Sequence, residues 1–161
     1  MLSRFSTRVL AAVALLAGAA CGDDPTGTDA DEFEATLTGA AERPNPVTTT
    51  ATGTASIDIN DSNSTIDFSV SVTGLVNPTL AHIHVGGVDV AGPPVVDLLP
   101  TPPAAGSFTG VLNSGTITAV MITGGETFAT LVAKIRSGEA YINVHTTANP
   151  GGEIRGQLVE D

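Results

Sequence analysis

The sequence predicts an all-β fold, an antiparallel β-sandwich with one short helix. From Phe33 onward, short runs of alternating apolar and polar residues are divided by Gly, Pro, Asn and Asp, as strands and turns are in all-β domains. The clearest run is STIDFSVSVTG, residues 64–74, in which every second residue from Ile66 to Val72 is apolar. Only one segment shows the spacing of an amphipathic helix. At 161 residues the chain has room for one domain.

The first twenty residues have the layout of an export signal. Arg4 and Arg8 precede an apolar run over residues 9–17, and small residues follow. The run is too short to span a bilayer. We therefore expect residues 1–20 to be a signal peptide that is removed on export.

Cys21, the only cysteine, directly follows this segment in LLAGAAC. This junction resembles the bacterial lipobox, in which the cysteine is lipidated and becomes the mature N-terminus. Two or more acyl chains would hold the domain stably at a membrane without a spanning helix. Gly22, rather than an aspartate that retains lipoproteins at the inner membrane, favours the outer membrane or cell surface. The other interpretation is an ordinary secreted protein with an incidental cysteine.

The mature protein is strongly acidic. The formal net charge is −11 for the whole chain and becomes −13 when Arg4 and Arg8 leave with the signal peptide. Such a surface repels nucleic acid, so a nucleic-acid partner is not expected. Residues 21–31 are rich in Asp, Gly, Thr and Pro, which predicts a disordered acidic tether ahead of a domain over residues 32–161.

Eight strands are expected in the domain. The turn-forming residues NDSNS favour a hairpin between the second and third strands. Residues 90–106, which contain five of the ten prolines, are expected to be a long loop that holds an edge strand. The predicted strands cover residues 34–40, 53–60, 64–74, 80–85, 95–99, 107–113, 139–146 and 153–160. This number of short strands is typical of a two-sheet sandwich or a barrel.

The segment GETFATLVAKIRSGE, residues 125–139, predicts the helix. Phe128, Leu131, Val132 and Ile135 follow helical spacing, while basic residues and Gly138 come at the end.

The last two strands are expected to form a hairpin with one apolar and one polar face. Burying the even-numbered apolar residues of both strands on one side requires even residues to face even ones. A register centred on Pro150 satisfies this and places Ile142 opposite Leu158 and His145 opposite Arg155. The polar face then carries Tyr141, Asn143, His145, Glu153, Arg155 and Gln157.

Three histidines are the residues best suited to chemistry. His82 and His84 stand two apart in LAHIHV, so both imidazoles project from one face of a strand. With His145 they would suffice for a zinc or copper site that keeps an open position. Arg155 beside His145 would disfavour its protonated form, and Glu153 is a possible bidentate partner for Arg155.

The alternative is a structural role, in which the histidines and Arg155 satisfy one another and loop carbonyl groups beneath the proline-rich segment. Catalysis by a nucleophile is not expected, because Cys21 would be lipidated and no serine lies in a G-x-S-x-G setting.

AHIHVGG, a proline-rich segment, a helix and the closing GEAYINVHTTANPGGEIRGQL together resemble the CHRD domain, over residues 32–159. The resemblance implies an extracellular β-sandwich module without established catalytic activity, of Greek-key-like topology as in superoxide dismutases and immunoglobulins. It implies no cofactor, and it does not identify the protein or envelope component that would be the ligand. The recognisable family positions are His82, His84, Tyr141, Asn143, His145, Gly152, Glu153, Arg155 and Gly156.

The H-x-H strand and the late NPGGEIRG also resemble copper/zinc superoxide dismutases. The chain departs from that pattern, because it has three histidines in all, no cysteine pair and no histidine-rich zinc loop. We therefore expect a non-enzymatic, lipid-anchored CHRD module at the cell envelope that acts in binding or as a structural element. The alternative is a copper- or zinc-binding protein that uses His82, His84 and His145.

Overall fold

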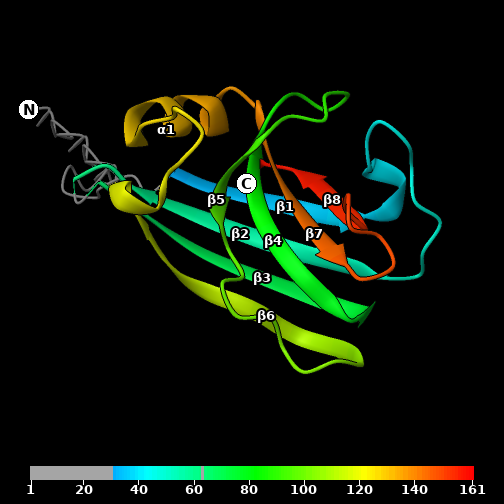
Figure 1. The fold of residues 1–161 in the computed structure, drawn as a ribbon. Coiled ribbons are helices and arrows are strands. Elements are labelled where there is room, and N and C mark those ends of the chain that lie inside the picture. The colour runs from blue at the N-terminus through cyan, green and yellow to red at the C-terminus, as the bar shows by residue number, and fades with distance from the viewer. Residues whose placement is uncertain (1–30, 63) are drawn as a thin grey trace, which may run out of the picture.

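The computed structural model describes residues 31–62 and 64–161. The predicted signal peptide, Cys21 and the tether up to Ala30 lie outside the described residues. The elements, shown in Figure 1, are β1 (Asp31–Thr38), β2 (Thr52–Asn60), β3 (Thr65–Val76), β4 (Pro78–Val85), β5 (Pro94–Asp97), β6 (Ser107–Thr118), α1 (Phe128–Arg136), β7 (Ala140–Thr146), β8 (Ile154–Gln157) and β9 (Val159–Glu160), with short 3-10 helices at Gly39–Ala41 and Ala119–Met121.

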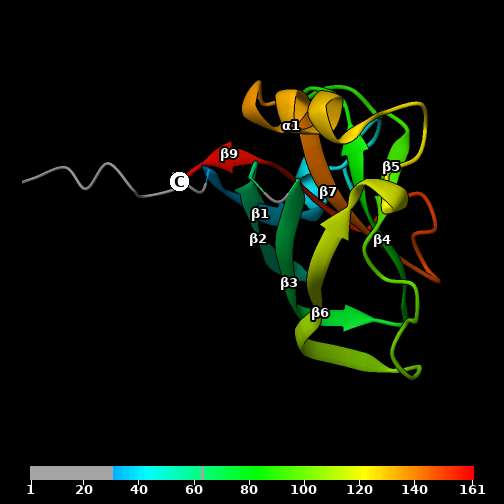
Figure 2. The same cartoon turned by 90° about the vertical axis from the view of Figure 1, so that its left-hand side faces the viewer.

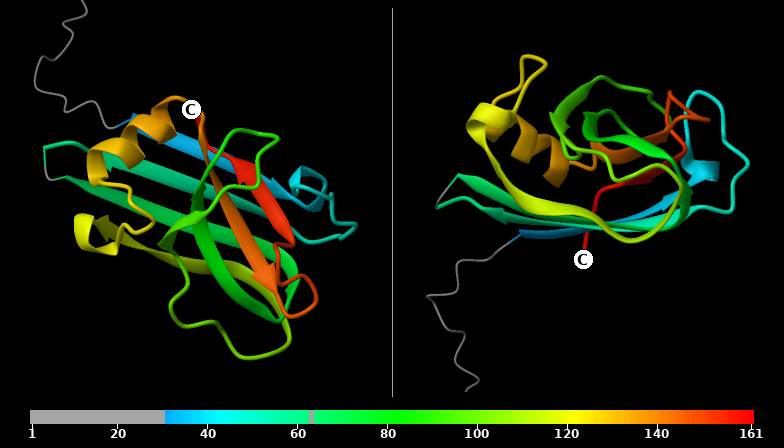
Figure 3. Two further views of the ribbon diagram at one scale, coloured as in Figure 1. Left: turned by 45° about the horizontal axis from the view of Figure 1, so that its top comes forward. Right: turned by 60° about the horizontal axis from the view of Figure 1, so that its bottom comes forward.

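The strands form one antiparallel sheet that folds over into two layers. Its order is β5-β4-β7-β8-β1-β2-β3-β6, and β9 also pairs with β1. The two layers join through β8 and β1, which share only the pair Thr38 and Arg155. Figure 1 shows β4 and β7 running across β1, β2 and β3, and the right-hand view of Figure 3 shows the layers one above the other. The predicted all-β class with one short helix is confirmed.

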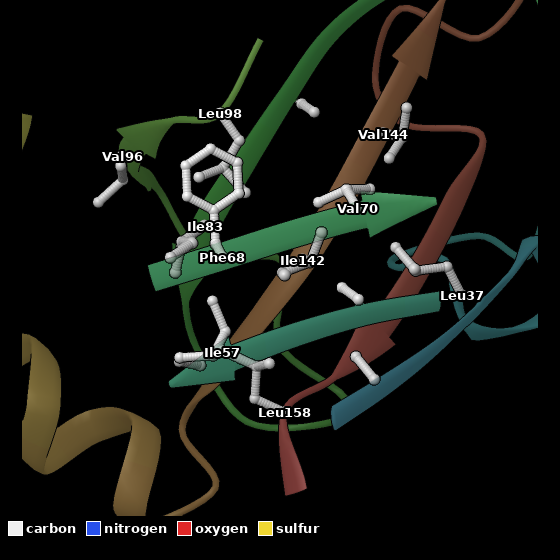
Figure 4. Close-up of a cluster of buried hydrophobic side chains, with 14 of the residues drawn as sticks. Leu37, Ile57, Phe68, Val70, Ile83, Val96, Leu98, Ile142, Val144 and Leu158 are labelled. Atoms are coloured by element: carbon white, nitrogen blue, oxygen red, sulfur yellow. The ribbon is translucent and has the colours of Figure 1, made fainter. Parts of the chain in front are cut away.

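Alternating apolar residues from both layers build the core. In β3, Ile66, Phe68, Val70 and Val72 are all buried, as the alternation of that run predicts. They meet side chains of the opposite layer, among them Ile83 of β4 (Figure 4). A strand that covers a core on one face and meets water on the other requires this period of two.

The predicted helix is present as α1. It begins after Thr127, whose side chain accepts a hydrogen bond from the Thr130 backbone N–H, while the Thr130 hydroxyl oxygen accepts one from the Thr127 backbone N–H. This capping box sets the start of the helix at Phe128, so Glu126 precedes the helix. Leu131, Val132 and Ile135 are buried, and α1 lies at one end of the sandwich (Figure 2). Within the described residues, no helix is long and apolar enough to cross a bilayer.

The proline-rich segment contains the predicted edge strand, because among the described strands β5 pairs only with β4. β6 is longer than expected and runs to Thr118. The register between β3 and β6 shifts twice, after Val70 and after Val72. Such bulges insert residues that break the alternating pattern, which is why alternation ended the predicted strand at residue 113.

The predicted register of the closing hairpin is wrong by two residues. Ile142 lies opposite Gly156 rather than Leu158, and Asn143 rather than His145 lies opposite Arg155. The Thr146 hydroxyl oxygen accepts a hydrogen bond from the Asn149 backbone N–H, so a side chain holds the turn. The hairpin is therefore centred on Asn149. A shift of two keeps every side chain on its predicted face.

Candidate functional site

The candidate site lies on the outer face of the layer that contains β4, β7 and β8. Every residue of β7 is buried, because its even-numbered side chains enter the core and its odd-numbered ones lie against other parts of the chain. Tyr141 contacts the cover loop, residues 86–93, which connects β4 with β5, whereas Asn143 contacts Glu42 and His145 contacts Pro150. The face predicted to be polar is therefore polar and also enclosed, but the cover loop contains only one of the five prolines of the proline-rich segment, Pro93.

The three histidines meet on this face. His82 and His84 project from β4, with ring centroids 5.5 Å apart, and His145 projects from the neighbouring β7, with its ring centroid 5.1 Å from that of His82. One ring nitrogen of each histidine lies within 4.8 Å of those of the other two. His84 and His145 are buried, and His82 is half-buried. The fold therefore assembles the cluster that the sequence suggested.

Backbone carbonyl groups fix the tautomers of two of these rings. His84 Nδ1 lies 2.9 Å from the Gly92 carbonyl oxygen, and His145 Nδ1 lies 3.0 Å from that of Pro150. Because a carbonyl oxygen only accepts, both Nδ1 atoms carry the proton, and in the neutral rings both Nε2 atoms keep a lone pair. His145 Nε2 faces His82 Nδ1 at 3.2 Å. His84 Nε2 is buried and has no hydrogen-bond partner among the described residues.

The environment keeps the cluster neutral. The pKa of His84 is lowered to about 4, mainly by burial and to a smaller extent by the neighbouring histidines and Arg155, against the opposing hydrogen bond to Gly92. Burial likewise lowers the pKa of His145, with a smaller contribution from His82. The expectation that Arg155 acts on His145 is wrong, because the shifted register places Arg155 beside Asn143 instead. Neutral imidazoles are the form that ligates metals.

Tyr141 and Arg155 connect the cluster to the cover loop. The Tyr141 ring stacks on His84 with centroids 4.9 Å apart, and the Arg155 guanidinium carbon lies 3.5 Å from the Tyr141 ring centroid. Arg155 donates hydrogen bonds to the carbonyl oxygens of Val90 and Gly87, at 3.0 and 2.9 Å. Arg155 as a whole residue is only 2% exposed. Arg155 therefore satisfies loop carbonyl groups, as the structural interpretation predicted.

Glu153 is not the partner of Arg155, contrary to the bidentate pair considered from the sequence. Its carboxylate accepts hydrogen bonds from Thr49, Thr146 and Asn149. Burial opposes ionisation, yet these three bonds together hold the pKa of Glu153 below its ordinary value. Glu153 lies just before β8, at the turn, so its side chain stabilises the hairpin turn and not the guanidinium.

Glu42 is a site residue that the sequence did not reveal. It lies in the connection between β1 and β2, outside any alternating run, so nothing in the pattern marks it. The Asn143 side-chain amide donates to Glu42 Oε2 at 3.3 Å, while Glu42 Oε1 and Asn143 Oδ1 have no partner among the described residues. Glu42 lines an open pocket of 280 Å³.

Gly152 lets these groups approach the turn. Its φ is +129°, and a Cβ atom there would lie 2.5 Å from Asn143 Oδ1 and 2.7 Å from Glu42 Oε2. Both the backbone conformation and the space therefore require glycine at this position. This is a physical reason for one of the glycines in the closing motif.

Glu42 is expected to make stability depend on pH. Burial raises its pKa to about 7, against the smaller effects of Asn143, Arg155 and Arg43. Because the folded-state pKa is higher than the unfolded one, this stabilisation is complete below about pH 4.5 and is lost as the pH rises through 7. We expect Glu42→Gln to abolish this pH-dependent decrease in the free energy of unfolding. The decrease amounts to about 1 to 2 kcal/mol after allowing for the solvent-open pocket. Urea denaturation at pH 5, 6, 7 and 8 measures it.

The matched control for this experiment is Glu34→Gln, which removes a carboxylate from an exposed position on β1. The difference in unfolding free energy between wild type and Glu42→Gln should change with pH, whereas the difference for Glu34→Gln should change much less. Parallel curves for wild type and Glu42→Gln across this range would contradict a buried, protonated Glu42.

The sequence comparison defines the class of protein. The chain matches the family model of the CHRD domain over residues 33–158, which include every strand residue of the candidate site. The protein is thus a β-sandwich module, and it belongs to the CHRD family. No curated protein and no solved structure matches the chain.

Proposed function

We propose that this protein is a non-enzymatic CHRD module, held at the cell envelope by a lipidated Cys21, that acts in binding or as a structural element. The observation that supports a non-catalytic role is the set of partners of the three histidines. They contact one another and the carbonyl oxygens of Gly92 and Pro150. A histidine that activates a nucleophile must instead face a hydroxyl or thiol group.

The anchor is supported by the sequence that precedes the fold. Cys21 follows an export signal, and β1 begins at Asp31. The intervening segment of about ten residues would reach about 35 Å at most when extended. Such a tether would keep the acidic domain close to a membrane surface, with an envelope protein or other envelope component as its partner and no nucleic acid.

Lipidation is tested with Cys21→Ser. Because acyl chains supply the membrane affinity, we expect the wild-type protein to partition into the detergent phase of a phase-separation assay and the variant to lose this partitioning completely. Incorporation of radiolabelled palmitate should disappear in the same variant. A wild-type protein that stays in the aqueous phase would contradict the anchor.

Metal binding is a second candidate function, favoured by the convergence of the three histidine rings. It is compatible with the anchored module, since a bound copper or zinc ion would then be what the module binds. Dismutase activity is not proposed, because three histidines are too few for two metal sites of that type.

A further inference from the structure

We propose that His82 Nδ1, His84 Nε2 and His145 Nε2 bind one copper or zinc ion and leave a further coordination position open. The proposal deepens the binding role of the module and does not depend on the lipid anchor. It starts from an atom that the fold leaves without a partner: His84 Nε2 is buried and unpartnered among the described residues. A buried acceptor of this kind is uncommon in a folded protein and points to an absent ligand.

The lone pairs of the cluster converge. Because Gly92 and Pro150 hold the Nδ1 protons of His84 and His145, the Nε2 atom of each ring is the one free to ligate. His145 Nε2 already faces His82 Nδ1, so the third ligand atom is identified by the contact. A metal would replace the hydrogen bond between these two rings, with the His82 proton moving to Nε2. No carboxylate or thiolate takes part in the three-nitrogen set.

The spacing suits a small transition-metal ion. Metal–nitrogen bonds of 2.0–2.1 Å at tetrahedral angles place two ligand nitrogens about 3.3 Å apart. The His82 Nδ1 and His145 Nε2 atoms are 3.2 Å apart, and no pair in the cluster exceeds 4.8 Å. Closing the widest pair therefore requires a movement of about 1.5 Å, which is within the reach of imidazole ring rotation. Imidazole nitrogens favour copper and zinc over magnesium and calcium.

Groups behind the rings complete the arrangement. Metal-ligating histidines characteristically donate their second ring N–H to a carbonyl or carboxylate oxygen, which fixes ring orientation. Gly92 and Pro150 supply such carbonyl groups to His84 and His145. Asp97 on β5 lies opposite His82, and its negative charge acts on that imidazole. His82 is the half-buried member, so an ion would reach the cluster from the side of His82.

The fold also protects this arrangement at Gly92. A Cβ atom at that position would lie 1.7 Å from the Val85 carbonyl oxygen, so any side chain would displace the cover loop. The Gly92 carbonyl and amide groups meanwhile contact His84 and the Tyr141 hydroxyl. The cover loop thus holds the His84 ring from behind.

The test uses the exported protein, purified without a polyhistidine tag, so that the three histidines of the chain are the only ones in the sample. Metal is removed with a chelator, and zinc(II) or copper(II) is then titrated in, with metal content measured after dialysis. We expect about one equivalent of one of these ions and a rise in melting temperature on binding. The ion retained more tightly identifies the metal.

Variants locate the site. His82→Gln changes the half-buried histidine and should fold normally, yet weaken binding by at least about 100-fold, since even outer-shell changes cost 10- to 100-fold. The double variant His82→Gln, His84→Gln should retain no metal. Asp97→Asn should weaken binding by about 10-fold. The histidine variants keep every acidic surface residue, and Asp97→Asn removes only one. Metal ions that merely adsorb to surface carboxylates would therefore still bind to these variants.

Two outcomes would overturn the proposal. One is a wild-type protein that retains less than about a tenth of an equivalent of either metal and shows no change in melting temperature. The other is equal metal retention by wild type and the double variant, which would mean adsorption to carboxylates. Cys21→Ser separates this test from that of the anchor, because this variant should bind metal like the wild type while losing detergent partitioning.

Discussion

Replacing Ile142 or Leu158 by alanine is expected to lower the free energy of unfolding by about 2 to 5 kcal/mol in each case. Both side chains are completely buried, Ile142 in the centre of the core and Leu158 after β8 (Figure 4). Truncation removes buried methyl and methylene groups and leaves a cavity that the surrounding sheet layers can only partly fill. Urea denaturation followed by far-UV circular dichroism measures the change.

Val159→Ala is the matched control, since Val159 follows Leu158 directly and is 58% exposed. Its loss should change the unfolding free energy by less than about 0.5 kcal/mol, as surface substitutions do. If Ile142→Ala and Leu158→Ala both gave changes as small as this, the assignment of the core face of the hairpin would be wrong.

Arg155→Ala is expected to lower the free energy of unfolding by about 1 to 3 kcal/mol. The change leaves the carbonyl groups of Gly87 and Val90 without their donor and removes the cation that lies over the Tyr141 ring. Arg155→Lys should recover only part of the loss, because an ammonium group cannot reproduce the fork of guanidinium donors. Thermal and chemical denaturation of both variants provide the measurement.

Arg136→Ala provides the comparison with an exposed arginine. Arg136 forms ion pairs with Asp31 and Asp61 at the surface, where water screens the charges. Its removal should cost at most about 1 kcal/mol. Equal effects of Arg155→Ala and Arg136→Ala would show that the bonds to the cover loop do not stabilise the fold.

The faces of the strands could be predicted from the sequence because side-chain direction alternates with a period of two. The alternation in β3 and the even-numbered apolar residues of β7 both identified buried side chains correctly. The helix was also predictable, since its apolar spacing and its final basic residues are local signals. These features depend on neighbouring residues in the chain and not on distant ones.

The register of the closing hairpin could not be predicted from the same pattern. Shifts of two residues leave every side chain on the same face, so hydrophobic alternation does not distinguish them. Hydrogen bonds of Thr146 and Asn149 decide the register in the structure. The wrong partner for Glu153 has a different cause, because its partner Thr49 lies in a distant loop that no local pattern connects with Glu153.

The sequence by itself determined the strand faces, the helix, the acidic charge and the presence of three histidines, because each is set by composition or by local periodicity. Only the tertiary structure decided which polar groups meet. Glu42 reaches Asn143 across 101 positions of the chain, and Arg155 reaches the carbonyl of Gly87 across 68. Such contacts arise when the two layers and the cover loop close around a common core, and no local pattern in the sequence encodes them.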